Sequence, residues 1–154
     1  MKELYFLTFR MLLRTLTGQW SIFNAMQKIE LLARKSRIAP LKSTSISRLE
    51  LCACLLLSKL VKKVLLSLKM NIENVTLFSN STIALAWINS PAHQLKTFVG
   101  NRASKIQSLT EQYQWRHISS AENPADIISR GADPTDLKTL NLWWTGPAIF
   151  INEQ

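Results

Sequence analysis

Three common catalytic signatures are missing from this sequence. It contains no glycine-rich phosphate-binding loop, no HExxH zinc motif and no GxSxG nucleophile elbow. P-loop nucleotide-hydrolysing enzymes and HExxH metalloproteases each depend on one of the first two patterns. α/β-Hydrolases depend on the third. The absence of all three removes these enzyme classes from consideration.

Cysteine is scarce as well. Cys52 and Cys54 are the only two, and they stand two residues apart in an apolar, helix-like stretch. Residues at this spacing point to different sides of a helix, so the thiols are not expected to pair, and no zinc-ligand spacing surrounds them. We predict that both are buried, reduced and structural, which fits an intracellular chain, cytoplasmic or nuclear.

The sequence also lacks an unbroken hydrophobic run of membrane-spanning length. The leucine-rich stretch 51–68 is interrupted by three lysines, well short of the ~18 apolar residues that a span requires. The amino-terminal residues 1–23 mix charged side chains into their apolar run and have no clean signal-peptide core. No membrane partner is predicted.

Acidic residues are few: the 154-residue chain has ten Asp and Glu against 19 Lys and Arg, a formal net charge of +9. The excess is uneven, because residues 28–69 hold ten Lys and Arg against only Glu30 and Glu50. Such density favours a polyanionic partner, nucleic acid before membrane. A solvated basic face without a specific partner is the alternative explanation of the same charge.

Length and a hydrophobic content of 47% indicate one globular domain with a real core. Periodicity predicts an α/β order of strands and helices. Strands are predicted at 4–9, 29–33, 75–78 and 114–118, with a weaker candidate at 20–26. Helices are predicted at 47–69, 82–89, 98–109 and 124–129, and 11–16 could be helical. Residues 34–42 are predicted to form a basic loop.

Three polar positions stand out within these elements. Asn80 follows an apolar strand and precedes a helix, which places it at the carboxyl edge of a sheet, where α/β folds carry catalytic groups. Glu50 lies in the first turn of the long helix, and Asp126 in a helix opened by Asn123 and Pro124. Each also has a purely local explanation. Asn80 or Ser79 could cap a helix, Glu50 could complete a capping box with Ser47, and Asp126 could offset a helix dipole.

Five segments together resemble the ribonuclease H-like domain of BEL/Pao-type retrotransposon polyproteins. Three of them carry the polar positions: Ala39-Pro-Leu-Lys-Ser-Thr-Ser-Ile-Ser-Arg-Leu-Glu-Leu51, Leu77-Phe-Ser-Asn-Ser-Thr-Ile83 with Ala86-Trp87-Ile88, and Asn123-Pro-Ala-Asp-Ile-Ile-Ser-Arg-Gly131. The other two are Lys96-Thr-Phe-Val-Gly-Asn-Arg102 and Leu142-Trp-Trp-Thr-Gly-Pro147. The resemblance covers a domain at 29–149. It leaves 1–28 as a divergent segment that could replace the first strands, and 150–154 as a tail.

The resemblance implies a ribonuclease H-like fold, a mixed five-stranded sheet flanked by helices. It also implies an activity, cutting RNA in RNA–DNA hybrids with two Mg²⁺ ions. Four carboxylates hold these ions about 4 Å apart in the family. Glu50 matches the acid on the first long helix and Asp126 the acid on the last helix. Asn80 stands at the position of a third acid, and no acid occupies the first-strand position. We therefore predict weak or absent Mg²⁺ binding and a catalytically inactive domain.

The parent polyprotein implied by the resemblance places the domain between reverse transcriptase and integrase, which are its expected partners together with an RNA–DNA hybrid. Four basic residues are candidates for contacting phosphate groups: Arg37, Lys42, Arg102 and Lys105. Three hypotheses for the function follow: an active nuclease, a catalytically silent nucleic-acid-binding module, and a decayed remnant without a selected role. His117 falls within a predicted strand and His93 in a loop, so neither is assigned a catalytic role.

Overall fold

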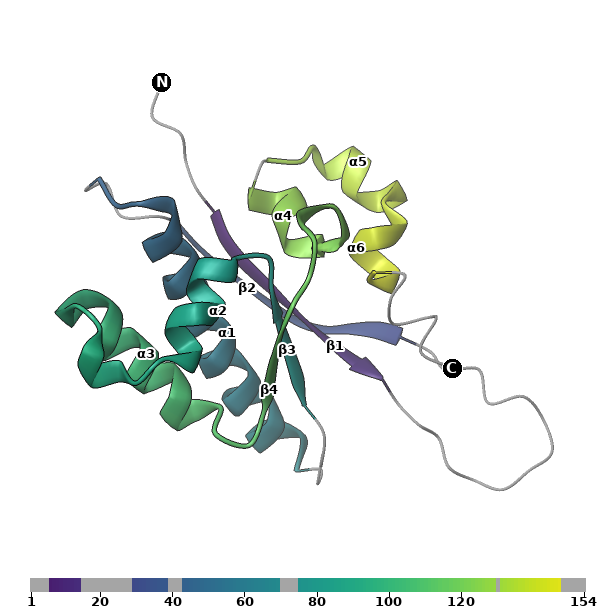
Figure 1. The fold of residues 1–154 in the computed structure, drawn as a ribbon. Helices are drawn as coiled ribbons and strands as arrows, with labels where there is room; N and C mark the ends of the chain where they lie inside the picture. The colour runs from purple at the N-terminus through teal and green to yellow at the C-terminus, as the bar shows by residue number, and fades with distance from the viewer. Residues whose placement is uncertain (1–5, 15–28, 39–42, 70–74, 130, 148–154) are drawn as a thin grey trace.

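The longest element of the computed structural model is α1 (Ile46–Leu68), which contacts both strands that precede it and two of the helices that follow it (Figure 1). The structure describes residues 6–14, 29–38, 43–69, 75–129 and 131–147. Along α1 the buried positions recur at helical spacing, while its lysines at 59, 62 and 63 are exposed. The predicted amphipathic helix is therefore confirmed. It ends where Lys69 takes a left-handed conformation (φ 51°).

The start of α1 corrects the predicted capping box. Ser45, not Ser47, is the N-cap residue, and no side chain caps the helix; the backbone N–H of Leu49 donates to the Ser45 carbonyl at 3.1 Å. Glu50 consequently lies in the second turn rather than the first. The stretch 43–47 offers four Ser or Thr residues as caps, so pattern alone could not select one. Burial of Leu49 and Leu51 fixes the helix position instead.

Two antiparallel strands precede α1. They are β1 (Phe6–Arg14) and β2 (Ile29–Ile38), paired from Phe6↔Ile38 to Arg14↔Ile29 with one irregularity between Met11 and Leu12. The predicted strand at 4–9 is confirmed over its described residues. The helical option for 11–16 is wrong over residues 11–14, and the predicted loop at 34–42 is wrong over residues 34–38. Both stretches are strand because 11–14 finds backbone partners within 29–33 and 34–38 finds them within 6–10, which no local pattern reveals. The candidate strand at 20–26 lies outside the described residues.

A second strand pair follows α1. β3 (Thr76–Ser79) runs parallel to β4 (Gln114–His117), in a register from Thr76↔Gln114 to Ser79↔His117. Between them the chain forms α2 (Thr82–Asn89), the 3₁₀ turn η1 (Ala92–Gln94) and α3 (Thr97–Leu109). The strands β3 and β4 and the helices α2 and α3 agree with the predicted elements to within a residue, whereas η1 had no predicted counterpart. A parallel pair joined by helices is the arrangement that this order predicts.

The described strands thus form two two-stranded sheets, one antiparallel and one parallel. A single five-stranded sheet, which the resemblance implied, is not what the described residues show. The coarser expectation, an α/β fold compatible with a ribonuclease H-like domain, is met. α1 contacts β1, and its buried residues Ala53, Leu57 and Val61 pack with Leu77 of β3. α1 therefore lies against both strand pairs.

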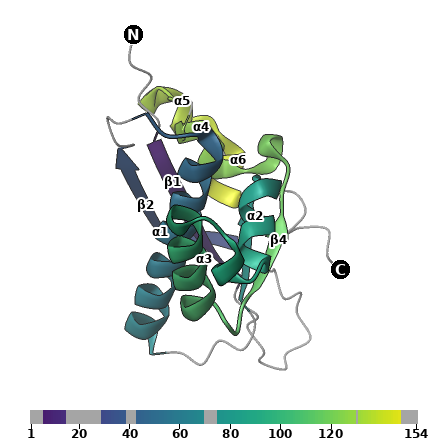
Figure 2. The same cartoon turned by 60° about the vertical axis from the view of Figure 1, so that its left-hand side comes forward.

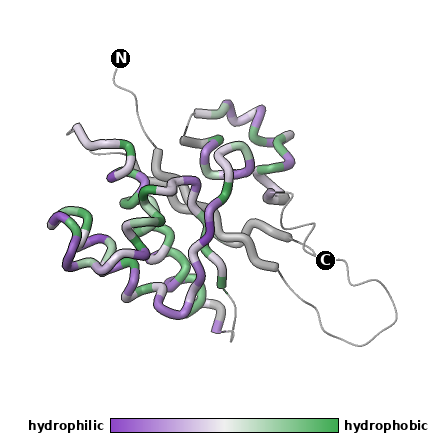
Figure 3. Tube along the Cα trace, viewed as in Figure 1, coloured by the Kyte–Doolittle hydropathy of each residue, from purple (hydrophilic) through white to green (hydrophobic). Residues whose placement is uncertain are grey.

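A second core cluster joins α1 to α2 and α3. Its buried members are Leu51, Cys54, Ala84, Ile88, Val99 and Ile106. Hydropathy alternates along α1 and α3, as expected for helices with one buried side (Figure 3). Trp115 of β4 packs against both clusters, and its indole N–H donates to the Thr110 hydroxyl at 3.1 Å. The tryptophan ties the parallel strands to the helices.

Three short helices end the described chain: α4 (Pro124–Ser129), α5 (Pro134–Thr139) and α6 (Asn141–Thr145). They follow the 3₁₀ turn η2 (Ser120–Glu122) and group at the end of the molecule away from α3 (Figures 1 and 2). α4 contacts β1, and α6 contacts both β2 and α4. α5 had no counterpart in the sequence-based prediction. It starts with a short polar cap, in which the Asp133 carboxylate accepts from the Thr135 N–H at 2.8 Å.

Gly100 lies where α3 packs closely against η1 and the residue that follows it. A methyl group added at its Cα would sit 2.6 Å from the Ala92 carbonyl oxygen and 3.2 Å from that of Leu95. We expect Gly100→Ala to lower the free energy of unfolding by about 1–3 kcal/mol, because backbone atoms must move to relieve the overlap. Alanine's higher helix propensity, worth about 1 kcal/mol at most, is too small to offset this.

Urea unfolding measures the effect of the Gly100 substitution. The matched control is Ser104→Ala, at an exposed position of the same helix, which should leave stability unchanged or slightly raise it. A Gly100→Ala protein as stable as the Ser104→Ala protein would show that α3 and η1 do not approach this closely.

Candidate functional site

The candidate site forms where the parallel strands end. β3 and β4 finish together at Ser79 and His117, and the next N–H, from Ile118, donates to the Ser79 carbonyl at 3.1 Å. The polypeptide leaves the sheet after each strand at the same edge, the carboxyl edge, where α/β folds gather functional groups. The sequence-based placement of Asn80 at this edge is confirmed.

Asn80 does not cap the following helix. The α2 N-cap is Ser81, whose hydroxyl accepts from the Ala84 N–H at 3.1 Å, while the Ser79 hydroxyl accepts from the Ser81 N–H at 3.2 Å. The local explanation that assigned the cap to Asn80 or Ser79 is therefore wrong. Asn80 is half-buried, and its side-chain NH₂ donates to the Ser120 hydroxyl at 3.1 Å. That bond joins the end of β3 to η2.

Asp126 lies in the first turn of α4, after the turn that follows η2. The Asn123 side-chain oxygen accepts from the Ala125 N–H at 3.1 Å, and the Asp126 N–H donates to the Asn123 carbonyl at 3.1 Å. The predicted start of the helix, with Asn123 before Pro124 and an acid in the first turn, is confirmed. Asp126 is half-buried. Its helix α4 contacts both η2 and β1.

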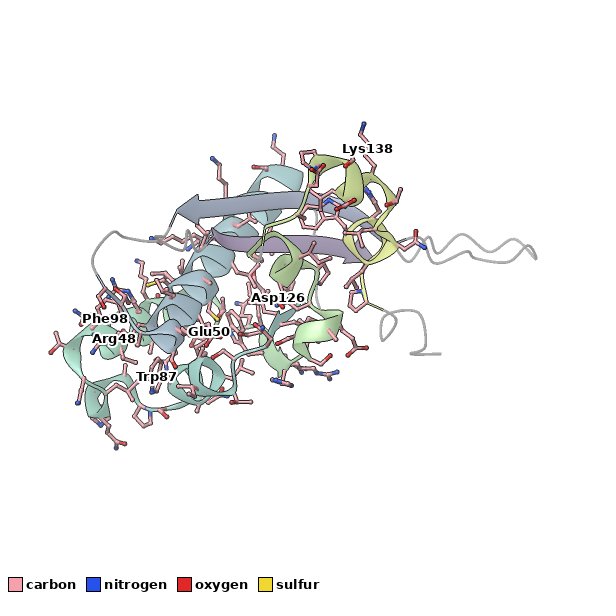
Figure 4. All side chains as sticks on the ribbon, turned by 90° about the horizontal axis from the view of Figure 1, so that it is seen from above. Arg48, Glu50, Trp87, Phe98, Asp126 and Lys138 are labelled. Carbon is pink, nitrogen blue, oxygen red and sulfur yellow. The ribbon has the colours of Figure 1, made fainter. Side chains whose placement is uncertain are left out.

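Glu50 lies on α1 and is half-buried. It lies one turn before Cys54, whose buried thiol hydrogen-bonds with the Ser79 side chain at the end of β3. Burial raises the pKa of Cys54 to about 12, with the nearby negative charge of Glu50 adding to the effect. Glu50 and Asp126 both lie toward the middle of the molecule in Figure 4. The contacts described above connect the elements that carry the three sequence-predicted positions: the Cys54–Ser79 contact joins α1 to the β3 end, the Asn80–Ser120 bond joins that end to η2, and η2 contacts α4.

Cys54 is buried and Cys52 is half-buried, and both are free thiols. The expectation that they do not pair is confirmed. The half-buried position of Cys52 corrects the expectation that both are buried. Cys52 accepts a hydrogen bond at its sulfur from the Arg102 Nε–H at 3.3 Å. This contact links α1 to α3.

The donor set does not fit the two magnesium ions that the family uses. In the described part of the chain no three or more Asp, Glu, His or Cys side chains gather into a group that could hold a metal. Of the positions that the resemblance assigns, Glu50 and Asp126 carry a carboxylate and Asn80 carries a neutral amide. The sequence of β1, FLTFRMLLR, contains no acid. Two hard cations carrying four positive charges would face only two negative ones.

The predicted nucleic-acid-binding residues do not all meet at one place. Arg102 is half-buried on α3 and Lys105 is exposed on the same helix. Arg37 lies in β2, opposite Leu7 in the register, and Lys42 lies outside the described residues. His117, at the end of β4, and His93, in η1, are both exposed.

Sequence reasoning missed a cluster of two arginines on one aromatic ring. The guanidinium carbon of Arg102 lies 3.5 Å from the centre of the Phe98 ring, and that of Arg48 lies 5.0 Å from the same centre. Phe98 and Arg102 are four residues apart on α3, a spacing that brings side chains together on a helix and could have indicated their contact. Arg48 comes from α1, so only the packing of the helices reveals its part.

No helix in the described stretches is long and apolar enough to cross a bilayer.

Residues 20–81 match the family model described as the Pao retrotransposon-like RNaseH-like domain, over less than half of the chain. The match contains Glu50 and Asn80 and begins ahead of Ile29, where the sequence resemblance was placed; it does not reach Asp126. No curated protein and no solved structure matches the chain. The resemblance to the ribonuclease H-like domain of Pao-type retrotransposons is therefore confirmed, with the match to the family model lying at residues 20–81.

Proposed function

We propose that this chain is a catalytically silent ribonuclease H-like domain that binds nucleic acid without cutting it. The observation that carries the proposal is the chemistry at the end of β3. There Asn80 offers an amide, hydrogen-bonded to Ser120, where the family places a carboxylate. An amide oxygen carries no formal charge and is a much poorer ligand for Mg²⁺ than a carboxylate.

The amino-terminal strand supports the same proposal. β1 contacts both α1, which carries Glu50, and α4, which carries Asp126. A strand in this position is suited to bear the family's first acid, and we propose that β1 takes the place of that strand. Its nine residues include none that could bind a hard cation through a carboxylate. The set of four acids that would hold two metal ions is thus reduced to two.

Binding rests on charge. The formal net charge of +9 favours a polyanion, and residues 74–110 contain no Asp or Glu at all. α2, η1 and α3 fall within this stretch, which includes Lys96, Arg102 and Lys105. In a retroelement polyprotein, the polyanion that such a domain would meet first is an RNA–DNA hybrid. Reverse transcriptase and integrase domains of that polyprotein are the protein partners in this proposal.

A cleavage assay tests the catalytic half of the proposal. With a labelled RNA–DNA hybrid and millimolar Mg²⁺, we expect no turnover above background from the wild-type chain. Asn80→Asp should not restore cleavage, because it supplies a third carboxylate while the first-strand acid is still missing. Asn101→Asp, at an exposed position of α3, adds the same charge elsewhere and is the matched control.

Metal titration of the same proteins adds a readout independent of cleavage. Asn80→Asp should bind Mn²⁺ more tightly than either the wild type or Asn101→Asp, since it adds a charged oxygen ligand beside Glu50 and Asp126. Turnover by the wild-type chain would refute catalytic silence. Equal Mn²⁺ affinity in all three proteins would show that Asn80 does not face the two acids.

A decayed remnant is the competing account, and binding distinguishes it. A silent binding module should hold the hybrid at low salt and release it steeply as salt rises, because phosphate contacts release bound counterions. Hybrid binding that is undetectable at low salt would leave only the remnant account.

A further inference from the structure

We infer that Arg48, Phe98 and Arg102 form a phosphate clamp that grips the backbone of a bound nucleic-acid strand. The inference rests on the proposed binding function and assigns it a specific surface. The three residues come from two helices, α1 and α3, that pack against each other. Figure 4 shows Arg48 and Phe98 side by side at one edge of the molecule, apart from Glu50 and Asp126.

The ring of Phe98 holds two like charges close together. Both guanidinium carbons lie within 5.0 Å of its centre, and cation–π attraction to the ring face favours each of them. Two positive groups on one ring also repel one another, and an anion bound beside them would offset that repulsion. Among the described residues no carboxylate makes an ion pair with either arginine. An external anion is what this arrangement lacks.

Arg102 is fixed in place before any ligand arrives. Its Nη1 donates to the Phe98 carbonyl at 3.0 Å, and its Nε donates to the Cys52 sulfur at 3.3 Å. A guanidinium has five N–H donors, so three remain to hydrogen-bond a ligand. Because the group is already ordered, binding costs it little conformational entropy.

Arg48 keeps all of its donors for a ligand. Within the described part of the chain its contact is the ring of Phe98, and it makes no hydrogen bond there. Stacking on a ring orients the planar fork while leaving its N–H edge exposed, which is the geometry for bidentate contact with a phosphate. The pair therefore offers one fixed and one adjustable guanidinium.

The surroundings favour a phosphodiester backbone over a small acidic ligand. From residue 44 to residue 110 the sequence has eight Lys and Arg against Glu50 and Glu73. The exposed ones include Lys59, Lys62 and Lys63 on α1, Lys105 on α3, and Lys96 just before α3. An extended polyanion can reach several of these charges at once, whereas a single phosphate ion reaches only the clamp.

Binding of a labelled RNA–DNA hybrid, followed by fluorescence anisotropy over a salt series, tests the clamp. Arg48→Gln should weaken binding about tenfold at fixed salt, the size expected for lost hydrogen bonds to a charged group. The slope of log affinity against log salt should fall by about 1, the signature of one lost phosphate contact. Because Arg48 makes no hydrogen bond in the described structure, its replacement should lower the melting temperature only slightly, through the lost contact with Phe98.

Two further variants sharpen the result. Arg102→Lys keeps the charge but loses the fork and the stacking, so it should weaken binding at fixed salt with little change in slope. The matched control is Lys138→Gln, which removes one positive charge from exposed α5 at the other end of the molecule (Figure 4). It should alter neither affinity nor slope appreciably.

The outcomes separate the clamp from the broader proposal. If the wild type binds the hybrid and Arg48→Gln behaves like Lys138→Gln, the clamp is wrong and nucleic-acid binding stands. If the wild type fails to bind even at low salt, both fail. If Arg48→Gln reduces binding to phosphatidylserine vesicles but not to the hybrid, the clamp serves a membrane surface and the inference is overturned.

Discussion

Replacing Trp143 by alanine should lower the free energy of unfolding by about 3–5 kcal/mol, the cost of emptying a fully buried aromatic site. The Trp143 side chain is only 2% exposed, and it lies on α6, which contacts β2 and α4. Because α4 carries Asp126, loosening α6 should also loosen one side of the candidate site.

Guanidinium unfolding of the Trp143→Ala protein measures this cost, and the chain supplies its own control. Trp144 is the next residue but is 50% exposed, and its indole N–H donates to the Leu137 carbonyl at 2.8 Å. Trp144→Ala should cost no more than about 1.5 kcal/mol, the value of one hydrogen bond. Similar losses for the two tryptophans would contradict the packing of the carboxyl-terminal helices described above.

Raising the pH should destabilise the fold through Cys54. Burial raises the pKa of this thiol from its ordinary value of 9.0 to about 12, so the unfolded chain loses the thiol proton at a lower pH than the folded chain does. The folded state binds more protons between these two values, and its stability must therefore fall as pH rises. The contribution is fully present below about pH 9. It declines by roughly 1.4 kcal/mol per pH unit above that, to a loss of about 4 kcal/mol near pH 12.

Other groups also titrate at alkaline pH, so the measurement is a difference between variants. Stability is followed from about pH 8 to about pH 11 for the wild type, Cys54→Ala and Cys52→Ala. Cys54→Ala should lack the extra decline, and Cys52→Ala should retain it. A wild-type slope that matches the slope of Cys54→Ala would show that the Cys54 thiol is exposed to solvent in the folded protein.

Much of the second half of the fold could be read from local pattern. The strand–helix boundary at Asn80, the helix over 82–89, and the Asn123-Pro124 start of α4 all follow from short-range signals: apolar runs, a proline and a capping side chain. These signals act over a few residues, where backbone preferences and caps decide the outcome. They failed for 34–38 and for the start of α1, because pairing with β1 and burial of Leu49 decide those boundaries.

Some features of the candidate site could also be predicted from the sequence, and others could not. The identity of each position was readable from sequence: a glutamate at 50, an asparagine at 80, an aspartate at 126, and no acid in β1. Which element each occupies could be predicted, apart from the turn of α1 that carries Glu50. The contact of Asn80 with Ser120 and that of Cys54 with Ser79 could not be predicted, because each joins residues more than twenty positions apart.

The sequence by itself determined the chemistry that this protein can carry: an excess of positive charge, a shortage of carboxylates, and the residue types at the positions of a Pao-type ribonuclease H-like domain. Composition and short-range preference suffice for that, since charge and ligand type belong to each residue wherever it lies. Only the tertiary structure decided the neighbours. It brought Arg48 of α1 and Arg102 of α3 onto the ring of Phe98, and it buried Cys54 against the end of β3. Both results depend on helix packing between distant segments, which no local pattern encodes.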